Sequence, residues 1–250
     1  MPFVTNNVRD ERRSCQANRI GGVESPPRPR STRDRPAKPP LSEELILDTA
    51  LRVLREEGLD AVTMRRLATE LDTGPASLYV YIRNREELLN AMLDRIAGMV
   101  ELEEPDPSRW REQLHHLLMG MLRAMESHRG IARVAIANIP TGENALRGAD
   151  NMLALLLAGG IAPQDAAWAC DILPLITTSL AVETATYEER GDAPDAVGEE
   201  LAAFFTTLPP GRYPHLARCA TELTSGDGDT RFRFAIDAFL DGLVARSQRP

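Results

Sequence analysis

Two short amphipathic helical patterns joined by a tight turn lie in the first third of the chain. The first is centred on residues 62–68, and the second runs over residues 75–82 after a turn at residues 71–74. Pro75 fits the first turn of the helix that follows the turn, where its missing N–H leaves no helical hydrogen bond unmade. Two short helices at such a turn form a helix-turn-helix arrangement. This pattern constrains the fold more than any other segment, because it requires helices on both sides of the turn.

Residues suited to helix capping mark where the helices around this turn begin. Thr63 and Thr73 stand where side-chain oxygens would accept the first backbone N–H groups of the second and third helices. Asn84 followed by Glu87 resembles a capping box that opens a longer fourth helix. We therefore expect three short helices feeding a fourth over residues 41–100.

The rest of the chain continues as helical patterns separated by glycine, proline and charged residues. No stretch alternates apolar and polar residues as a half-buried strand does, so the chain is predicted to be all-α. The predicted domains are an arm over residues 1–40, a helix-turn-helix domain over 41–100 and a helical domain over 101–250. Further helices are expected at residues 108–128, 131–138, 143–158, 163–189, 195–208, 214–224 and 230–246.

The formal net charge of −8 argues at first against a partner as negative as nucleic acid. The charge is unevenly distributed, however. Residues 1–40 hold nine basic and four acidic residues, a net charge of +5, which leaves −13 for residues 41–250. Residues 26–40 are rich in proline and arginine and lack the apolar residues of a core, so this arm is predicted to be disordered. It is either an electrostatic arm for DNA phosphates or a minor groove, or a solvated tail that precedes a downstream start codon.

The sequence favours a cytoplasmic protein without a membrane partner. No apolar run approaches the roughly 20 residues of a membrane span, and the first residues lack the apolar stretch of a secretory signal. The cysteines, Cys15, Cys170 and Cys219, are odd in number and far apart, so they form neither a disulfide framework nor a zinc-binding pattern. We expect no metal and no cofactor.

The helix-turn-helix region resembles the tetracycline-repressor (TetR) family of bacterial transcription regulators. The resemblance rests on the segments Ala50-Leu51-Arg52-Val53-Leu54, Thr63-Met64-Arg65-Arg66-Leu67-Ala68 and Ser77-Leu78-Tyr79-Val80-Tyr81-Ile82-Arg83-Asn84-Arg85-Glu86-Glu87-Leu88-Leu89. The later helices are similar to the ligand-binding and dimerisation domain of tetracycline repressors.

This resemblance implies a homodimeric repressor that a small organic effector releases from a palindromic double-stranded DNA operator. An activator and a ligand-independent regulator remain open as alternatives. An enzyme is disfavoured, because the sequence shows no nucleophile elbow, phosphate-binding glycine loop or metal-ligand spacing.

A recognition helix presents its first residues to base edges, while flanking groups contact phosphates. Arg65 is suited to a bidentate contact with guanine or phosphate. The family pattern implies that both tyrosines after the turn touch DNA, and the arginines at the fourth helix are placed near phosphate. The alternative for the arginines is simple solvation. The predicted DNA-binding residues are Thr63, Arg65, Arg66, Pro75, Ala76, Ser77, Tyr79, Tyr81, Arg83 and Arg85.

The last helix carries a continuous apolar stripe over residues 232–244. By family analogy the stripe pairs with the long helix at 163–189 to form a dimer interface, and the alternative is an intramolecular core. It comprises Phe232, Ala235, Ile236, Phe239, Leu240, Leu243 and Val244.

An effector cavity among helices should be mostly apolar, with a few polar groups. The family places a ligand-binding asparagine at Asn151. Residues 133–136 and 173–176 hold none of the histidines of the family's magnesium–tetracycline site, so we expect an organic effector without a bridging metal. The predicted pocket residues are Met119, Leu122, Met125, Asn151, Leu155, Trp168, Thr177 and Thr178.

Overall fold

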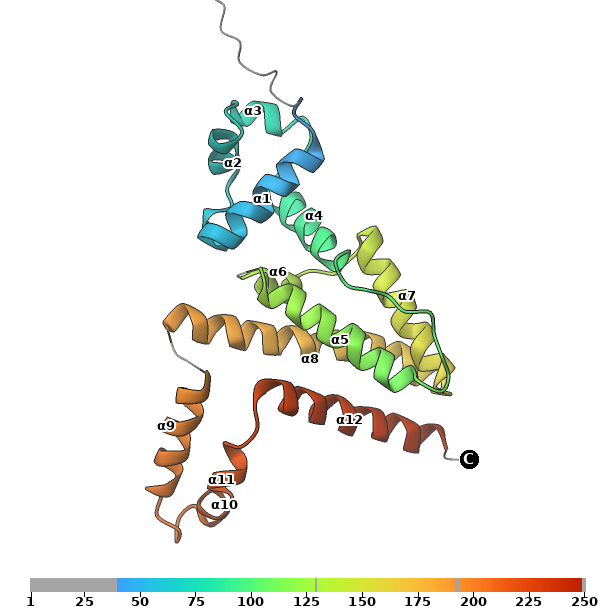
Figure 1. Ribbon diagram of the computed structural model, residues 1–250, viewed down its shortest axis with the longest axis vertical. Helices are drawn as coiled ribbons and strands as arrows, with labels where there is room; N and C mark the ends of the chain where they lie inside the picture. The colour runs from blue at the N-terminus through green and yellow to red at the C-terminus, as the bar shows by residue number, and fades with distance from the viewer. Residues whose placement is uncertain (1–39, 129, 192–193, 249–250) are drawn as a thin grey trace, which may run out of the picture. The chain divides into compact units, whose positions relative to one another are not determined.

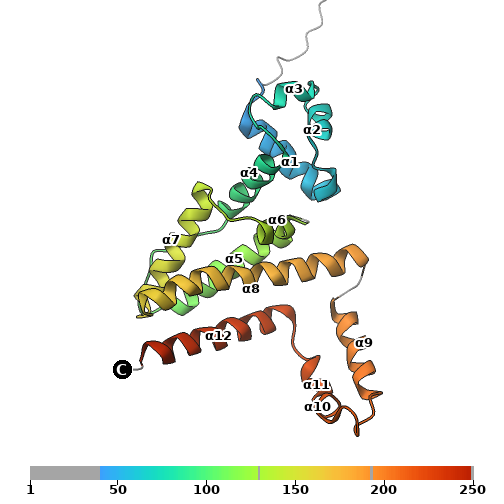
Figure 2. The same cartoon turned by 180° about the vertical axis from the view of Figure 1, so that it is seen from behind.

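The computed structural model describes residues 40–128, 130–191 and 194–248, and the predicted arm therefore lies almost entirely outside the described residues. The described part of the chain contains helices and turns but no strand, which confirms the all-α prediction (Figures 1 and 2). Leu41–Pro250 form one compact unit. The elements are α1 (Glu43–Glu57), the 3-10 turn η1 (Leu59–Ala61), α2 (Met64–Glu70), α3 (Pro75–Leu78), α4 (Arg85–Ala97), α5 (Trp110–Glu126), α6 (Ile131–Ala137), α7 (Glu143–Ala158), α8 (Pro163–Arg190), α9 (Pro194–Thr206), α10 (Pro214–Arg218), α11 (Ala220–Leu223) and α12 (Gly228–Ser247).

Side-chain caps start α2 and α4 where the sequence places them. Thr63 Oγ1 accepts the backbone N–H of Arg66 at 3.1 Å, and Asn84 Oδ1 accepts that of Glu87 at 2.8 Å. The cap predicted for α3 is wrong, since its N-cap residue is Gly74 rather than Thr73. The backbone N–H of Thr73 instead donates to the carbonyl of Ala68 at 2.9 Å. The backbone of Thr73 therefore belongs to the end of α2, and the N-cap of α3 falls one residue later than predicted.

Other helix boundaries differ from the predicted ones for local reasons. α5 begins at Trp110 rather than at residue 108, because Asp106 Oδ1 accepts both the backbone N–H and the hydroxyl of Ser108 in a turn. α12 begins earlier than predicted, because Asp227 caps it by accepting the N–H of Thr230 at 2.7 Å. The single helix predicted over residues 214–224 is divided at Cys219 into α10 and α11.

The C-terminal helices are organised around α8. α5, α6, α7 and α12 all pack against it, and Leu173 and Ala169 on α8 are fully buried. By length and mean hydropathy (1.3 over its most apolar window) α8 is also long and apolar enough to cross a membrane, contrary to the expectation that no apolar run reaches this length. Such a test is weak evidence, because the core helix of a globular protein passes it as well. Four helices of the chain pack on α8, and 39% of its most apolar window is buried.

The apolar stripe of α12 faces the chain's own core. Phe232, Ile236, Leu240 and Leu243 are at most 7% exposed and belong to the same hydrophobic cluster as the buried residues of α8. Figures 1 and 2 show α12 running beside α8. The prediction that this stripe forms the dimer interface is therefore wrong for its buried members, and the intramolecular alternative holds.

Replacing Ile236 with alanine should leave a cavity between α12 and the core. We expect the free energy of unfolding to fall by about 2–5 kcal/mol, as for other fully buried aliphatic side chains, and urea denaturation measures the change. Arg233→Ala, at an exposed position of the same helix, is the control and should stay within about 0.5 kcal/mol of wild type. Equal stability of the two variants would contradict the burial of this face.

Candidate DNA-binding surface and effector site

The helix-turn-helix unit has a buried side and an exposed side. Leu78 and Ile82 are 0% and 1% exposed, so they pack inward as predicted. On the other side Pro75 and Ala76 are exposed and Ser77 is half-buried. The exposed side therefore offers small side chains and one hydroxyl at the start of α3.

The segment after α3 is a turn rather than a continuation of the predicted helix. α3 ends at Leu78, and the carbonyl of Leu78 accepts the N–H groups of Tyr81 and Ile82, both at 3.0 Å. Tyr79 and Tyr81 are 49% and 42% exposed on this turn. Both rings are thus accessible on the surface next to α3, as a contact with DNA requires.

Val80 lies between these two tyrosines and is 80% exposed. It is not among the predicted DNA-binding residues, because a large aliphatic side chain gives no sequence signal for a DNA contact. Leu78 and Ile82 face inward on either side of the tyrosines, so the middle residue of the turn had to face outward. An apolar side chain in this position can contact a thymine methyl group or the sugar of a nucleotide.

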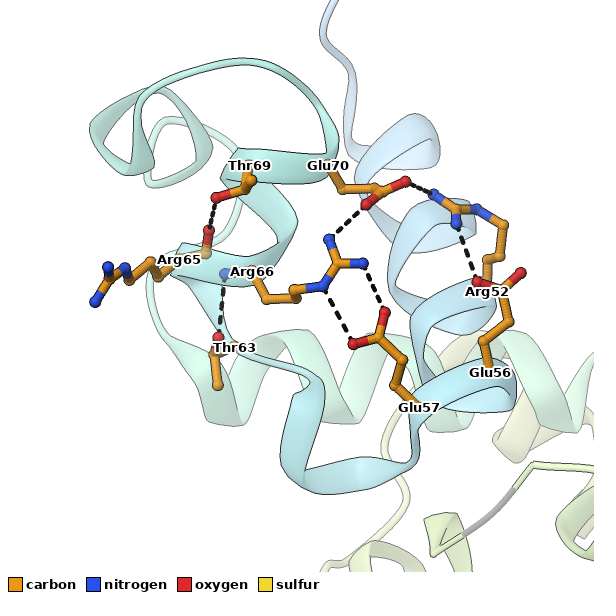
Figure 3. A network of polar contacts seen from close by, with 8 residues as sticks. All are labelled: Arg52, Glu56, Glu57, Thr63, Arg65, Arg66, Thr69 and Glu70. Carbon is orange, nitrogen blue, oxygen red and sulfur yellow. Dashed lines mark hydrogen bonds and ion pairs between the residues drawn. The ribbon is translucent and has the colours of Figure 1, made fainter.

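The two adjacent arginines of α2 have opposite environments (Figure 3). Arg66 is the centre of a charge network between α1 and α2: its Nη2 lies 2.6 Å from Glu57 Oε1, and its Nη1 contacts Glu70. Glu70 also binds Arg52 at 2.6 Å, and Arg52 pairs with Glu56 at 3.2 Å. Hydrogen bonds from Arg66 lower the pKa values of Glu57 and Glu70 and raise that of Arg66. Arg66 therefore joins two helices instead of extending into solvent.

Arg65 extends away from this network in Figure 3. Its side chain is exposed, and its guanidinium makes no ion pair with any residue that the structure describes. Thr63, also exposed, uses its hydroxyl oxygen to cap α2. Arg65 is therefore the α2 arginine with its donors accessible to a phosphate or base.

The arginines near the start of α4 both have partners within the chain. Arg83 is an exposed side chain that pairs with Glu87 at 3.0 Å and lowers the pKa of that carboxyl. Glu87 accepts the backbone N–H of Arg83 at 2.6 Å, whereas a complete capping box would require the N–H of Asn84. Arg85 donates from Nε to the carbonyl of Val62 at 3.1 Å, so it braces the entry to α2.

The structure brings most of the predicted pocket residues into one region, where α5, α7 and α8 pack together. Thr178 contacts Met125 through a 3.9 Å hydrogen bond from Oγ1 to the sulfur, and Leu155 on α7 is also buried. Trp168 does not join them, because it is 56% exposed on the surface of α8. Of the remaining candidates, Leu122 and Thr177 are buried, and Met119 is half-buried.

Asn151 has one satisfied and one unsatisfied polar atom. Its Nδ2 donates to the carbonyl of Glu103 at 2.8 Å, in the segment between α4 and α5. Its Oδ1 is buried and accepts no hydrogen bond from the residues described. A buried carbonyl oxygen without a donor costs about 1–3 kcal/mol, so this atom can gain from a ligand that donates.

A hollow of about 260 Å³ lies over α5 and the preceding segment, and its lining includes Glu103, His116, Met119 and Arg123. Met119 is its one member from the predicted pocket. A second hollow of about 340 Å³ is lined by residues from α1, η1, α6 and α8. Among the residues that the structure describes, no group of three or more histidine, cysteine or acidic side chains is placed to hold a metal ion.

Substituting the two α2 arginines separately should distinguish a DNA contact from a structural ion pair. Arg65→Ala should weaken DNA binding and reduce the slope of log affinity against log salt by about 1, as the loss of one phosphate contact predicts. Its melting temperature should not change. Filter binding at several salt concentrations measures the slope, and an unaltered slope and affinity would exclude Arg65 from the interface.

Arg66→Ala is the matched comparison at the adjacent position. It should lower the melting temperature, because it leaves Glu57 and Glu70 without their shared partner. The folded-state pKa values of these carboxyls lie below the ordinary 4.5. The stabilisation is therefore complete above that pH and is lost as the pH falls through the lowered values, so the difference from wild type should shrink in acid.

The chain matches two known families and several solved structures. Residues 46–92 match "Bacterial regulatory proteins, tetR family", and residues 104–247 match "Tetracyclin repressor-like, C-terminal domain". Apo ActR from Streptomyces coelicolor is 37% identical with a TM-score of 0.75, over 84% of this chain and 100% of ActR. The complex of ActR with actinorhodin gives 36% identity and a TM-score of 0.77, over 84% of this chain and 99% of ActR. The HTH-type transcriptional repressor DrrR1 of Streptomyces coeruleorubidus is 26% identical over 82% of this chain and 78% of DrrR1. The chain belongs to the TetR family and is a DNA-binding transcription regulator.

Proposed function

We propose that this protein is a homodimeric repressor that a small organic effector releases from a palindromic operator. The observation that carries the proposal is the exposed face of the helix-turn-helix unit, where Arg65 is accessible beside the start of α3. Similarity to DrrR1, named a transcriptional repressor, supports the sign of regulation. The protein acts in the cytoplasm by binding and not by catalysis.

The exposed side of the unit divides into parts suited to different DNA groups. Pro75, Ala76 and Ser77 approach base edges in the major groove, since the first residues of a recognition helix lie deepest. Tyr79 and Tyr81 contact the sugar-phosphate backbone on the flank of the same groove. Arg65 is available from α2, whereas Arg66, Arg83 and Arg85 act mainly by holding the unit together, as their internal partners indicate.

The dimer forms through apolar side chains that α8 and α12 leave exposed. On α8 these are Trp168, Ile172 and Leu175, at 56%, 37% and 47% exposure, spaced four and three residues apart on one helical face. On α12 it is Phe234, at 73% exposure, on the side opposite the buried stripe. Large exposed apolar side chains grouped in this way mark interaction surfaces. Since one recognition helix reads few base pairs, a second copy is the partner that supplies a second half-site.

The effector binds among α5, α7 and α8 and donates a hydrogen bond to Asn151. The unsatisfied Oδ1 of Asn151 supports this assignment, because a hydroxyl group there would remove the cost of a buried acceptor. Asn151 also holds the carbonyl of Glu103 in the segment that leads from α4 to α5. A ligand that engages this side chain therefore acts next to the connection with the DNA-binding helices. Binding of actinorhodin by ActR supports an organic effector.

A mobility-shift assay on the DNA upstream of the protein's own gene tests the function. We expect a discrete complex that dissociates when a suitable effector is added, and actinorhodin serves as the first probe. Asn151→Leu, which keeps the number of side-chain heavy atoms but removes the acceptor together with the amide donor, should retain DNA binding while weakening the response to the probe at least tenfold. Leu157→Ala, at an exposed position of α7, is the control. Absence of any shift with the flanking promoters would refute the proposal.

Introducing a charge into the exposed face of α8 should separate the subunits. Trp168→Glu should weaken dimerisation by at least about thirtyfold, the effect of removing a central aromatic anchor. Sedimentation velocity measures it, with an unchanged helical circular dichroism spectrum. Ile139→Glu, at an 87% exposed apolar position outside this face, should leave the dimer intact. A Trp168→Glu protein that remains dimeric would rule out this interface.

A further inference from the structure

The N-terminus of α7 lies against α4, and a single carboxylate joins the two helices. The N-cap residue of α7 is Gly142, which has no side chain with which to accept a backbone N–H. Asp94 on α4 supplies the acceptor: its Oδ1 accepts the N–H of Ala145 and its Oδ2 accepts the side-chain amide of Asn144, both at 3.0 Å. The negative charge also interacts favourably with the dipole of this 16-residue helix. α7 is thus capped by a residue of another helix.

Two glycines allow this close approach. A β-carbon built on Gly142 would lie 2.1 Å from Asp94 Oδ1, and one built on Gly98 would lie 2.9 Å from Cγ of Asn144. Neither separation is tolerated by real atoms, so a side chain at residue 142 would displace the carboxylate from the helix end. Gly148, in the interior of α7, differs, because a β-carbon there would meet no atom within 4 Å.

α4 connects this junction to the DNA-binding surface. At its first residue, Arg85 donates to the carbonyls of Leu59 and Val62, just before α2. Leu88 and Met92 are fully buried and belong to the same hydrophobic cluster as the core residues of α1 and α2. One end of this continuous 13-residue helix is therefore fixed to the helix-turn-helix unit, and the other end is held by Asp94.

We propose that Asp94 is a positioning residue for operator recognition: by capping α7, it holds α4 and the attached helix-turn-helix unit in one orientation. The effect on the spacing of two recognition helices rests on the proposed homodimer, because the direction of α4 in each subunit then sets the distance between half-sites. The capping contact itself is independent of that function.

Hydrogen exchange in the full-length protein tests the cap directly. In Asp94→Ala the backbone amides of residues 144–146 should exchange about five- to tenfold faster, the effect of losing one cap. Gly142→Ala keeps Asp94 but fills its space, so it should produce the same change. Gly148→Ala is the matched control and should exchange no faster than wild type, because alanine favours the helix interior more than glycine does. Unchanged exchange in both test variants would overturn the proposal.

Operator binding then separates positioning from general stability. Footprinting with wild type defines the operator, and affinity is measured for it and for a copy with one base pair inserted between the half-sites. Wild type and Gly148→Ala should bind the altered copy at least about tenfold more weakly, because the insertion changes the half-site spacing. In Asp94→Ala and Gly142→Ala this ratio should fall to about threefold or less.

The two measurements fail in distinguishable ways. Test variants that lose affinity equally for both operators, with the ratio retained, would overturn the positioning role and leave Asp94 a stabilising cap. If wild type binds no operator, the proposed function and the positioning role fail together. The exchange rates would still decide whether Asp94 caps α7.

Discussion

The backbone N–H groups in the first turn of each helix need hydrogen-bond acceptors. The acceptors that supply them determine where the helices of the DNA-binding unit begin and how α4 contacts α7. Within the unit, Thr63 and Asn84 supply the acceptors for α2 and α4. α7 takes its acceptor from Asp94 on α4. A lost cap costs only about 1 kcal/mol, but each cap also fixes where the chain enters a helix. Capping hydrogen bonds therefore fix the helices within the helix-turn-helix unit, and one of them also joins α4 to α7.

In an acidic chain that binds DNA, arginines that pair with glutamates of the same chain are not free to contact phosphates. Arg52 and Arg66 pair with three glutamates of α1 and α2, and Arg83 pairs with Glu87. These pairs keep acidic side chains compensated close to the surface that meets phosphate. Arg65 remains accessible. Internal pairing thus joins the helices of the unit and compensates most of the acidic charge near the surface proposed to contact DNA.

The local features of the fold could be predicted from the sequence, and the partners of each surface could not. Capping residues and helical periodicity predicted α2, α4 and α7 closely, because these signals act within a few residues. The stripe of α12 was recognised as apolar, but periodicity does not say whether a face packs on its own chain or on another. For the same reason Trp168 was expected in a pocket and lies on the surface. Asp94 carried no recognisable signal, since its partner stands 51 positions away.

Because α4 is one continuous helix, a small rotation at the Asp94 junction produces a larger displacement at its other end. From Arg85 to Asp94 the helix rises about 1.5 Å per residue, or about 13 Å in all. A rotation of about 5° at the α7 end would move the other end by about 1 Å. A hydrogen bond to a base edge tolerates only a few tenths of an ångström before it weakens. If α4 positions the helix-turn-helix unit as proposed, a displacement too small to disturb the packing of α7 is amplified, over the length of one helix, into a misfit at the groove.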